Sequence, residues 1–178
     1  MSNNHFRIIG KTLYGLEDIL SAELAALGAV KITKLTRSIE FWGDLELLYK
    51  VNIWCRTATR FLVPVSTFRA SDPDQLYRAV GKLDWSKYLA VRDRFVIDPV
   101  VSHSDFRHSH FVAQKAKDAI VDQFRKRTGK RPSVDAADPD LRINLHIHQN
   151  NATLSFDSSG EALHRRGYRT EGGEAPIN

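Results

Sequence analysis

The residues best suited to bind a ligand lie between Arg107 and Arg131, in the stretch RHSHFVAQKAKDAIVDQFRKRTGKR. Against two acids, Asp118 and Asp122, this stretch carries eight bases: Arg107, Lys115, Lys117, Arg125, Lys126, Arg127, Lys130 and Arg131. Eight minus two gives +6, which exceeds the +5 of the whole chain. Lys and Arg gathered on one element favour contact with a phosphate backbone. The ordinary alternative is that cations in a last helical turn complement the helix dipole.

The basic stretch is predicted to be a helix with one buried face, because apolar residues recur at helical spacing. These residues are Val112, Ala116, Ile120 and Phe124, with Phe111 and Ala119 beside them. Ser109 is the expected N-cap, and Gly129 is expected to end the helix. A buried face with a basic rim therefore positions the cations at the surface.

The loop before this helix is a second candidate, for one phosphate group. Ser104, Arg107, His108 and Ser109 bring hydroxyl, guanidinium and imidazole groups to a helix N-terminus, where backbone N–H groups also favour an anion. Phe106 has two interpretations: it stacks on an unpaired base, or it packs into the core beside the helix start.

Histidines and acids elsewhere are weaker candidates for metal binding. His146 and His148 lie two apart on an expected strand and share a face, and His103, His108 and His110 precede the basic helix. Without a fixed ligand spacing, polar-face histidines are the preferred interpretation. Asp135, Asp138 and Asp140 do not fit a calcium-loop pattern and are expected to be a solvated loop. We predict no metal, no catalytic residue and no cofactor in this chain, because nucleotide-binding glycine loops and CxxC pairs are absent from its sequence.

Length and composition indicate a soluble protein of one ordinary domain or two small ones. The 178 residues are 42% hydrophobic, with a sequence pI near 9.4. Cys55 is the one cysteine, so no intrachain disulfide is possible, and we expect it to be a small buried residue. No apolar run is long enough to span a membrane, and the N-terminus MSNNHFRIIG has no secretion signal. The expected location is the cytoplasm.

The segment 1–70 follows the order β-α-β-β-α-β. Strands are expected at 6–11, 30–35, 39–42 and 61–68, and helices at 15–28 and 44–55. This order is typical of the ferredoxin-like fold.

A second α/β pattern begins at Ser71-Asp72-Pro73, which is a turn and helix-cap signal. A helix over 76–83, a strand over 95–101 with Pro99 at a bulge or edge, and the basic helix follow. Alternation over 141–148 and 152–156 predicts a hairpin. The basic tail from Leu163, with Arg165 and Arg166, is typical of a linker.

Three stretches of the chain resemble the THUMP-domain RNA methyltransferases. GLEDILSAELAALG is similar to the family's opening helix, NIWCRTATRFLVPVSTFRA to the segment that follows, and LHRRGYRTEGGEAPIN to the linker that leads to its catalytic domain. KAKDAIVDQFR also fits the THUMP pattern. The resemblance covers nearly the whole chain, and the large-subunit rRNA guanine-N2 methyltransferases are the nearest group.

The resemblance implies an α+β or α/β fold with a ferredoxin-like domain at 1–70, a THUMP RNA-binding domain at 71–162, and a linker at 163–178 to a methyltransferase domain missing from this chain. Such a chain would bind large-subunit rRNA and no membrane, while the missing domain would use S-adenosylmethionine. The expected RNA-binding residues are Ser104, Arg107, His108, Ser109, Lys115, Lys117, Arg125, Lys126, Arg127, Lys130, Arg131, Arg165 and Arg166.

Two alternatives stay open. The same module can belong to a different, tRNA-modifying enzyme, or the chain can be a stand-alone RNA-binding protein without catalytic activity. DNA modification is disfavoured by the resemblance to RNA-binding THUMP proteins, since charge does not distinguish RNA from DNA.

Overall fold

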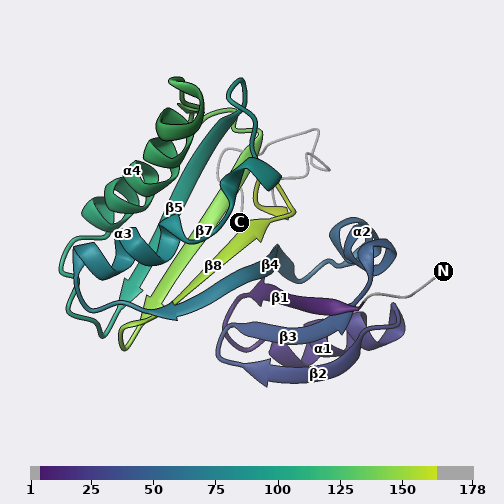
Figure 1. The fold of residues 1–178 in the computed structure, drawn as a ribbon. Helices are drawn as coiled ribbons and strands as arrows, with labels where there is room; N and C mark the ends of the chain where they lie inside the picture. The colour runs from purple at the N-terminus through teal and green to yellow at the C-terminus, as the bar shows by residue number, and fades with distance from the viewer. Residues whose placement is uncertain (1–4, 164–178) are drawn as a thin grey trace, which may run out of the picture. The chain divides into compact units, whose positions relative to one another are not determined.

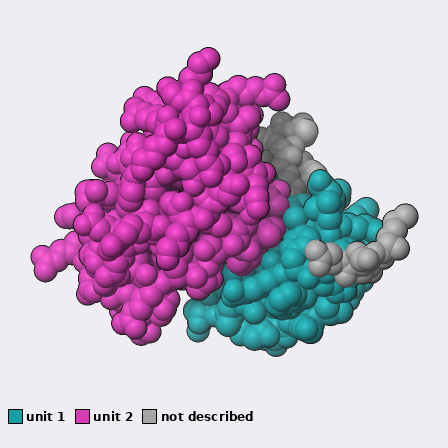
Figure 2. Space-filling view, in the orientation of Figure 1, with its two compact units in different colours: residues 1–61, 159–178 teal, residues 62–158 magenta. Residues whose placement is uncertain are grey.

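The computed structural model describes residues 5–163 and divides into two compact units. Unit 1 comprises residues 1–61 together with 159–178, and unit 2 comprises residues 62–158; Figure 2 shows them in teal and magenta. Each unit has its own arrangement of helices and strands.

Unit 1 has the predicted β-α-β-β-α-β order, formed by β1 (Phe6–Thr12), α1 (Glu17–Ala26), β2 (Val30–Leu35), β3 (Ser38–Gly43), α2 (Leu45–Trp54) and the start of β4 (Ala58–Arg69). Its strands are arranged in the order β2-β3-β1-β4, and β3 pairs antiparallel with both β1 and β2. The ferredoxin-like prediction is confirmed.

The helices of unit 1 bury apolar side chains in a shared core. Leu20 and Leu24 of α1 and Val51 of α2 have no exposed surface, and Phe41 and Phe61 meet edge to face. Asp44 caps α2 by accepting a hydrogen bond from the backbone N–H of Leu47 at 2.9 Å. That cap fixes the first turn of α2 directly after Gly43, the last residue of β3.

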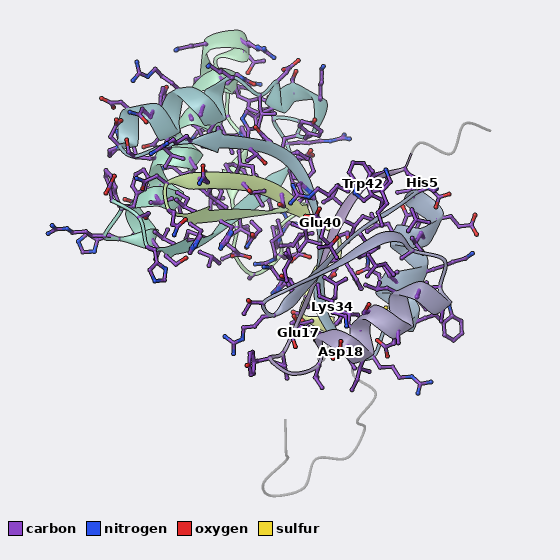
Figure 3. The ribbon with its side chains drawn as sticks, turned by 90° about the horizontal axis from the view of Figure 1, so that it is seen from below. His5, Glu17, Asp18, Lys34, Glu40 and Trp42 are labelled. Carbon is purple, nitrogen blue, oxygen red and sulfur yellow. The ribbon has the colours of Figure 1, made fainter. Side chains whose placement is uncertain are left out.

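Acidic residues join the N-terminus of α1 to the turn between β2 and β3. Glu17 accepts hydrogen bonds from the backbone N–H groups of Gly15 at 2.7 Å and Arg37 at 2.9 Å. Hydrogen bonds from the backbone N–H groups of Glu17 itself, Arg37 and Gly15 lower the pKa of the Glu17 carboxyl. Asp18 pairs with Lys34 of β2, as Figure 3 shows.

Unit 2 contains the rest of β4, then α3 (Pro73–Gly81), η1 (Trp85–Lys87), β5 (Arg94–Ser102), α4 (Ser109–Thr128), β6 (Ser133–Val134), β7 (Leu141–His148) and β8 (Asn151–Asp157). The strand order is β4-β8-β7-β5-β6. Strand β5 is parallel to β6 and β7, whereas β8 is antiparallel to β4 and β7. The predicted hairpin is therefore confirmed as β7 and β8.

Both helices of unit 2 lie on one face of its strands, as Figure 1 shows. The predicted cap at the start of α3 is confirmed, since Asp72 accepts from the N–H groups of Asp74 and Gln75. Trp85 is fully buried and its indole N–H donates to the Val80 carbonyl at 2.9 Å.

Pro99 occupies an edge position, as predicted. Strand β7 pairs with β5 along Phe95–Ser102, but on the other side β6 pairs only with Arg94 and Phe95. Within the described residues, the side of β5 beyond Phe95 is therefore open. A residue without a backbone N–H costs no ladder hydrogen bond on an open edge.

The three acids after α4 gather around one cation. Arg94 lies 3.5 Å from Asp135, 2.9 Å from Asp138 and 3.5 Å from Asp140. Asp140 also accepts from the Arg94 backbone N–H at 2.7 Å, and that bond, followed by the Arg94 charge, lowers the pKa of the Asp140 carboxyl. The loop predicted to be merely solvated is held to the start of β5.

We predict opposite effects for two glycine substitutions. A Cβ at Gly43 would overlap Cδ2 of Leu47 and lie 3.0 Å from Cγ and 3.1 Å from Cβ of the same residue, whereas a Cβ at Gly81 meets nothing within 4 Å. Gly43→Ala should lower the free energy of unfolding by about 1 to 3 kcal/mol through overpacking. Gly81→Ala, in a helical position, should raise it by roughly 0.4 to 1 kcal/mol. Denaturant unfolding of the two variants measures both values, and equal effects would contradict this account of Gly43.

A second prediction concerns the loss of folding stability at acidic pH. The pKa of the Asp140 carboxyl is lower in the folded protein than in the unfolded chain, for which 3.8 is the reference pKa. Ionised Asp140 therefore stabilises the fold at pH values above the unfolded pKa, and this stabilisation is lost as the pH falls through the folded pKa. Asp140→Asn keeps an acceptor but does not titrate. Wild type should therefore be more stable than Asp140→Asn near neutral pH, and the two should converge in acid. Urea unfolding across that range tests this, and a difference that persists undiminished in acid would contradict it.

Candidate nucleic-acid interface

The position of α4 is set by its apolar face. Val112, Ala116 and Ile120 have no exposed surface, and Phe124 is 4% exposed. Phe111, predicted to lie beside this stripe, is instead 42% exposed. At position 111 the helix already faces solvent, so the prediction for that residue was wrong.

Gln123 fixes the rotation of α4 relative to the loop after α3. Its amide nitrogen donates to the carbonyls of Gly81 at 3.1 Å and Leu83 at 2.7 Å, and its amide oxygen accepts from the Trp85 backbone N–H at 2.8 Å. These three hydrogen bonds satisfy backbone carbonyl and N–H groups that would destabilise the fold if they were buried without a partner. The cations of α4 are therefore presented from a helix that is held in one orientation.

The start of α4 differs from the prediction, and its end agrees. Ser109 is the first helical residue rather than the cap, and His108 holds the cap position without a side-chain hydrogen bond. At the other end Gly129 adopts the left-handed conformation with φ 71° and donates to the Arg125 carbonyl. A glycine terminates a helix in this way at no steric cost.

Three of the predicted RNA-binding cations are paired with acids. Lys117 lies 2.8 Å from Asp118, and Arg125 lies 3.7 Å from Asp122. Arg127 binds Asp84 at 2.6 Å and Ser86 at 3.0 Å. Hydrogen bonds from Ser86 and Arg127 lower the pKa of the Asp84 carboxyl. Arg127 thereby ties the end of α4 to η1, which is a structural role.

The other described cations of the predicted interface are available. Within residues 5–163, Arg107, Lys115, Lys126, Lys130 and Arg131 make no ion pair. Four of them are exposed, and Lys115 is half-buried. We call these five residues the free cations. Because a helix rises about 1.5 Å per residue, the length of α4 separates Arg107 from Lys126, Lys130 and Arg131 by roughly 30 Å.

The loop before α4 is less open to a phosphate than predicted. Asp105 and Asn150 bind each other through two hydrogen bonds, at 3.0 and 2.7 Å. The hydroxyl of Ser104 is buried and has no hydrogen-bond partner among the described residues. Phe106 is 9% exposed and belongs to the core of unit 2, which excludes stacking on a base. His108 and Ser109 are exposed at the helix start.

The histidines form a stack on the strands. His146 and His148 share a face of β7 as predicted, with ring centroids 6.5 Å apart and planes inclined by 3°. His103 meets His148 edge to face at 5.3 Å, and Ser102 lies 3.0 Å from Nδ1 of His148. In the described part of the chain, no group of three or more His, Cys, Asp or Glu residues could hold a metal ion.

The strands of unit 2 form a polar face that was not predicted from the sequence. Its members share the side of the sheet opposite to the core: Thr67, Arg69, Asp98, Ser102, Arg142, Asn144, His146, His148, Asn151 and Thr153. Arg142 is bound to Asp98 at 2.9 Å, whereas Arg69 is exposed. The alternation of polar residues was visible in the sequence, but the strand register that gathers them was not.

The predicted contacts of Arg165 and Arg166 lie outside the described residues. In residues 5–163, no helix combines the length and apolar character needed to cross a bilayer.

Two family models match this chain in succession. The RlmL ferredoxin-like domain matches residues 7–62 and the THUMP domain matches residues 70–157. The two matches correspond to the β-α-β-β-α-β order and to the unit that carries α4.

Curated relatives are longer than this chain. It is 46% identical over 163 residues to the ribosomal RNA large subunit methyltransferase K/L of Syntrophotalea carbinolica, covering 92% of this chain and 23% of that protein. It is 44% identical to a putative RNA methyltransferase of Synechocystis, covering 92% of this chain and 42% of that protein. The chain thus spans less than half the length of these relatives.

A solved structure has the same fold. The crystal structure of a predicted N6-adenine-specific DNA methylase from Listeria monocytogenes superposes with a TM-score of 0.83 at 27% identity, covering 98% of this chain and 46% of that one. The strand order, both family models and the relatives all indicate the same family. The chain belongs to the THUMP-domain proteins, with an RlmL ferredoxin-like domain followed by a THUMP domain.

Proposed function

We propose that this chain is the RNA-binding part of a longer cytoplasmic enzyme that methylates guanine N2 in large-subunit rRNA with S-adenosylmethionine. The single observation that carries this proposal is the 46% identity to a ribosomal RNA large subunit methyltransferase K/L, which the chain covers over 23% of that protein's length. The free cations supply the physical means of binding. The methyltransferase domain is proposed to follow this chain in the same polypeptide.

Binding by α4 would begin with electrostatic capture. Lys126, Lys130 and Arg131 lie at its C-terminal end, where the helix dipole also favours positive charge. Phosphates that approach this end neutralise the cations and release counterions. Arg107, about 30 Å away at the other end, would contact a second stretch of backbone. Two separated contacts favour a shaped RNA over a short strand, since double-stranded RNA is recognised mainly by shape, phosphates and 2′-hydroxyl groups.

One hollow on unit 1 is poorly suited to S-adenosylmethionine. A hollow of about 300 Å³ on unit 1 is lined by His5, Leu27, Gly28, Gly43, Asp44, Glu46, Leu47 and Lys50. Its two carboxylates are engaged, because Asp44 caps α2 and Glu46 binds Lys50 at 2.6 Å. A nucleoside pocket needs an apolar slot with convergent polar groups that are free to bind the ligand. This hollow is mainly polar, and its carboxylates already bind other groups of the protein. We place the cofactor outside this chain and assign it no catalytic step.

We therefore predict that the 178-residue chain does not bind S-adenosylmethionine, because its sequence carries none of the glycine-rich nucleotide-binding motifs. Calorimetric titration of the isolated chain should give no binding heat. The longer polypeptide, titrated under the same conditions, is the positive control. Micromolar binding to the isolated chain would overturn the division of roles proposed here.

Our main prediction concerns the salt dependence of RNA binding. A triple variant with Lys115→Gln, Lys126→Gln and Lys130→Gln should weaken binding to large-subunit rRNA. The slope of log affinity against log salt should shrink by about 0.7 to 0.9 for each cation–phosphate pair that the variant removes. Surface changes of this kind alter stability by about 0.5 kcal/mol or less, so the thermal midpoint should hold. Filter binding at several salt concentrations measures the slope.

The matched control removes three cations from unit 1, with Lys31→Gln, Arg37→Gln and Arg56→Gln, none of which makes an ion pair among the described residues. All three are exposed, and both triple variants lower the net charge equally. Equal weakening by the two variants would mean that only net charge matters. An unchanged slope in the α4 variant would refute the interface. Competition with tRNA separates the alternatives, since preference for tRNA would point to a tRNA-modifying parent enzyme.

A further inference from the structure

The polar face of unit 2 ends in a row that crosses four neighbouring strands. Ser102, the last residue of β5, is paired with His148, the last of β7. Asn151, the first residue of β8, is paired with His148 on one side and with Arg69, the last of β4, on the other. Residues paired directly across a sheet point to the same side. Since strands lie about 4.8 Å apart, the row is roughly 14 Å long. We call these four residues the end row.

The end row presents a cation, an amide and an imidazole to solvent. Arg69, Asn151 and His148 are all exposed. Within residues 5–163, the Arg69 side chain makes no ion pair and no hydrogen bond. The Ser102 hydroxyl lies 3.0 Å from Nδ1 of His148, so Nε2 is the imidazole nitrogen that can reach a ligand. His103, also exposed, adds a second ring, with its centroid 5.3 Å from that of His148.

Hydrogen bonds join the loops on both sides of the end row. The Gln149 N–H, in the turn between β7 and β8, donates to the Ser102 carbonyl at 3.3 Å. The Ala70 N–H, directly after β4, donates to the Asn150 carbonyl at 2.9 Å. The Asn150 side chain also binds Asp105 of the loop after β5. Figure 1 shows these ends of β4, β5 and β7 at the same end of unit 2. The row is therefore held in place before a ligand arrives, which lowers the cost of ordering on binding.

The acids of this region are already bound to other groups. Asp98, on the same face, binds Arg142 at 2.9 Å, and Asp105 accepts from the Asn150 amide at 2.7 Å. Arg69 is therefore the charge that the end row offers to a ligand. The row has no apolar member, whereas the centre of a protein interface is apolar and aromatic. A cation beside exposed imidazole rings suits the phosphates and bases of an unpaired RNA strand.

The end row lies close to the start of α4. Ser102 and Arg107, one of the free cations, are five positions apart, so their Cα atoms are separated by at most about 18 Å. An RNA that contacts Arg107 can therefore reach the end row as well. The length of the row corresponds to about four nucleotides, because a stacked strand rises about 3.4 Å per nucleotide.

We propose that the end row binds an unpaired segment of the RNA, next to the double-stranded part that α4 contacts. This inference rests on the function proposed above. Arg69 pairs with a phosphate, and the Asn151 amide bonds to a base edge. The rings of His103 and His148 stack on a base, as aromatic side chains do in proteins that bind single strands. Unit 2 thus recognises a junction between paired and unpaired RNA.

A matched pair of RNAs tests this proposal by fluorescence anisotropy. One RNA is a blunt hairpin, and the other is the same hairpin with an unpaired tail about as long as the end row, placed at either its 5′ or its 3′ end. One of the two tails should tighten binding of the 178-residue chain by about fivefold or more, the contribution of one stacked base. It should also steepen the slope of log affinity against log salt by about 0.7, for the phosphate at Arg69.

Two double variants locate the effect on one side of the sheet. Arg69→Gln with His148→Ala should abolish the advantage of the tail and leave binding of the blunt hairpin unchanged, which also shows that the variant is folded. The control is Arg78→Gln with His110→Ala, at exposed residues of α3 and α4, which lie on the other face of the strands. It removes the same charge and the same ring, and it should keep the advantage of the tail.

Several outcomes would overturn the proposal. They are equal affinity of wild type for tailed and blunt RNA, a tail advantage that survives in the Arg69 and His148 variant, and equal loss in the control. Competition by polyglutamate as strong as by the unpaired strand means that the row accepts any polyanion. Wild type that binds neither RNA contradicts the proposed function as well. Binding of both RNAs with equal affinity contradicts only the role of the end row.

Discussion

Burial of one face of α4 is the constraint on which the arrangement of unit 2 depends. Val112, Ala116 and Ile120 are fully enclosed, so the helix has one possible rotation about its axis. Gln123 reinforces that rotation with three hydrogen bonds to the loop after α3. The directions of all charged side chains on α4 follow from this packing. The proposed interface is thus a geometric consequence of a hydrophobic core.

Acids from other elements then decide which cations remain available. Asp84 binds Arg127, and the intrahelical acids Asp118 and Asp122 lie beside Lys117 and Arg125. Exposed pairs of this kind contribute little to stability, typically about 1 kcal/mol or less, but they reduce the positive potential that a phosphate meets. The charge of the segment therefore overstates its capacity to bind RNA, and the five free cations are the better measure.

Local patterns predicted much of this fold. The order of helices and strands, the Asp72 cap and the β7–β8 hairpin follow from periodicity and turn residues, which act over a few positions. Contacts between distant residues could not be predicted in this way. Arg127 and Asp84 are 43 positions apart, and the three acids around Arg94 required the register of β5. Periodicity also cannot decide whether an apolar residue at the border of a stripe is buried, because packing partners settle that. Phe111 was misplaced for this reason.

The return of the chain to α2 has a consequence for biosynthesis. The hydrogen bond between Ser159 and Asn52 joins residues 107 positions apart, and that from Phe61 to Ser159 spans 98. The ribosome synthesises the chain from its N-terminus, so the β-α-β-β-α-β part of unit 1 can begin to fold before unit 2 has been made. Its final hydrogen bonds must wait until all of unit 2 has been translated. Contacts of such high sequence separation are slow to form, and the N-terminal domain is therefore both the first to begin folding and the last to be completed.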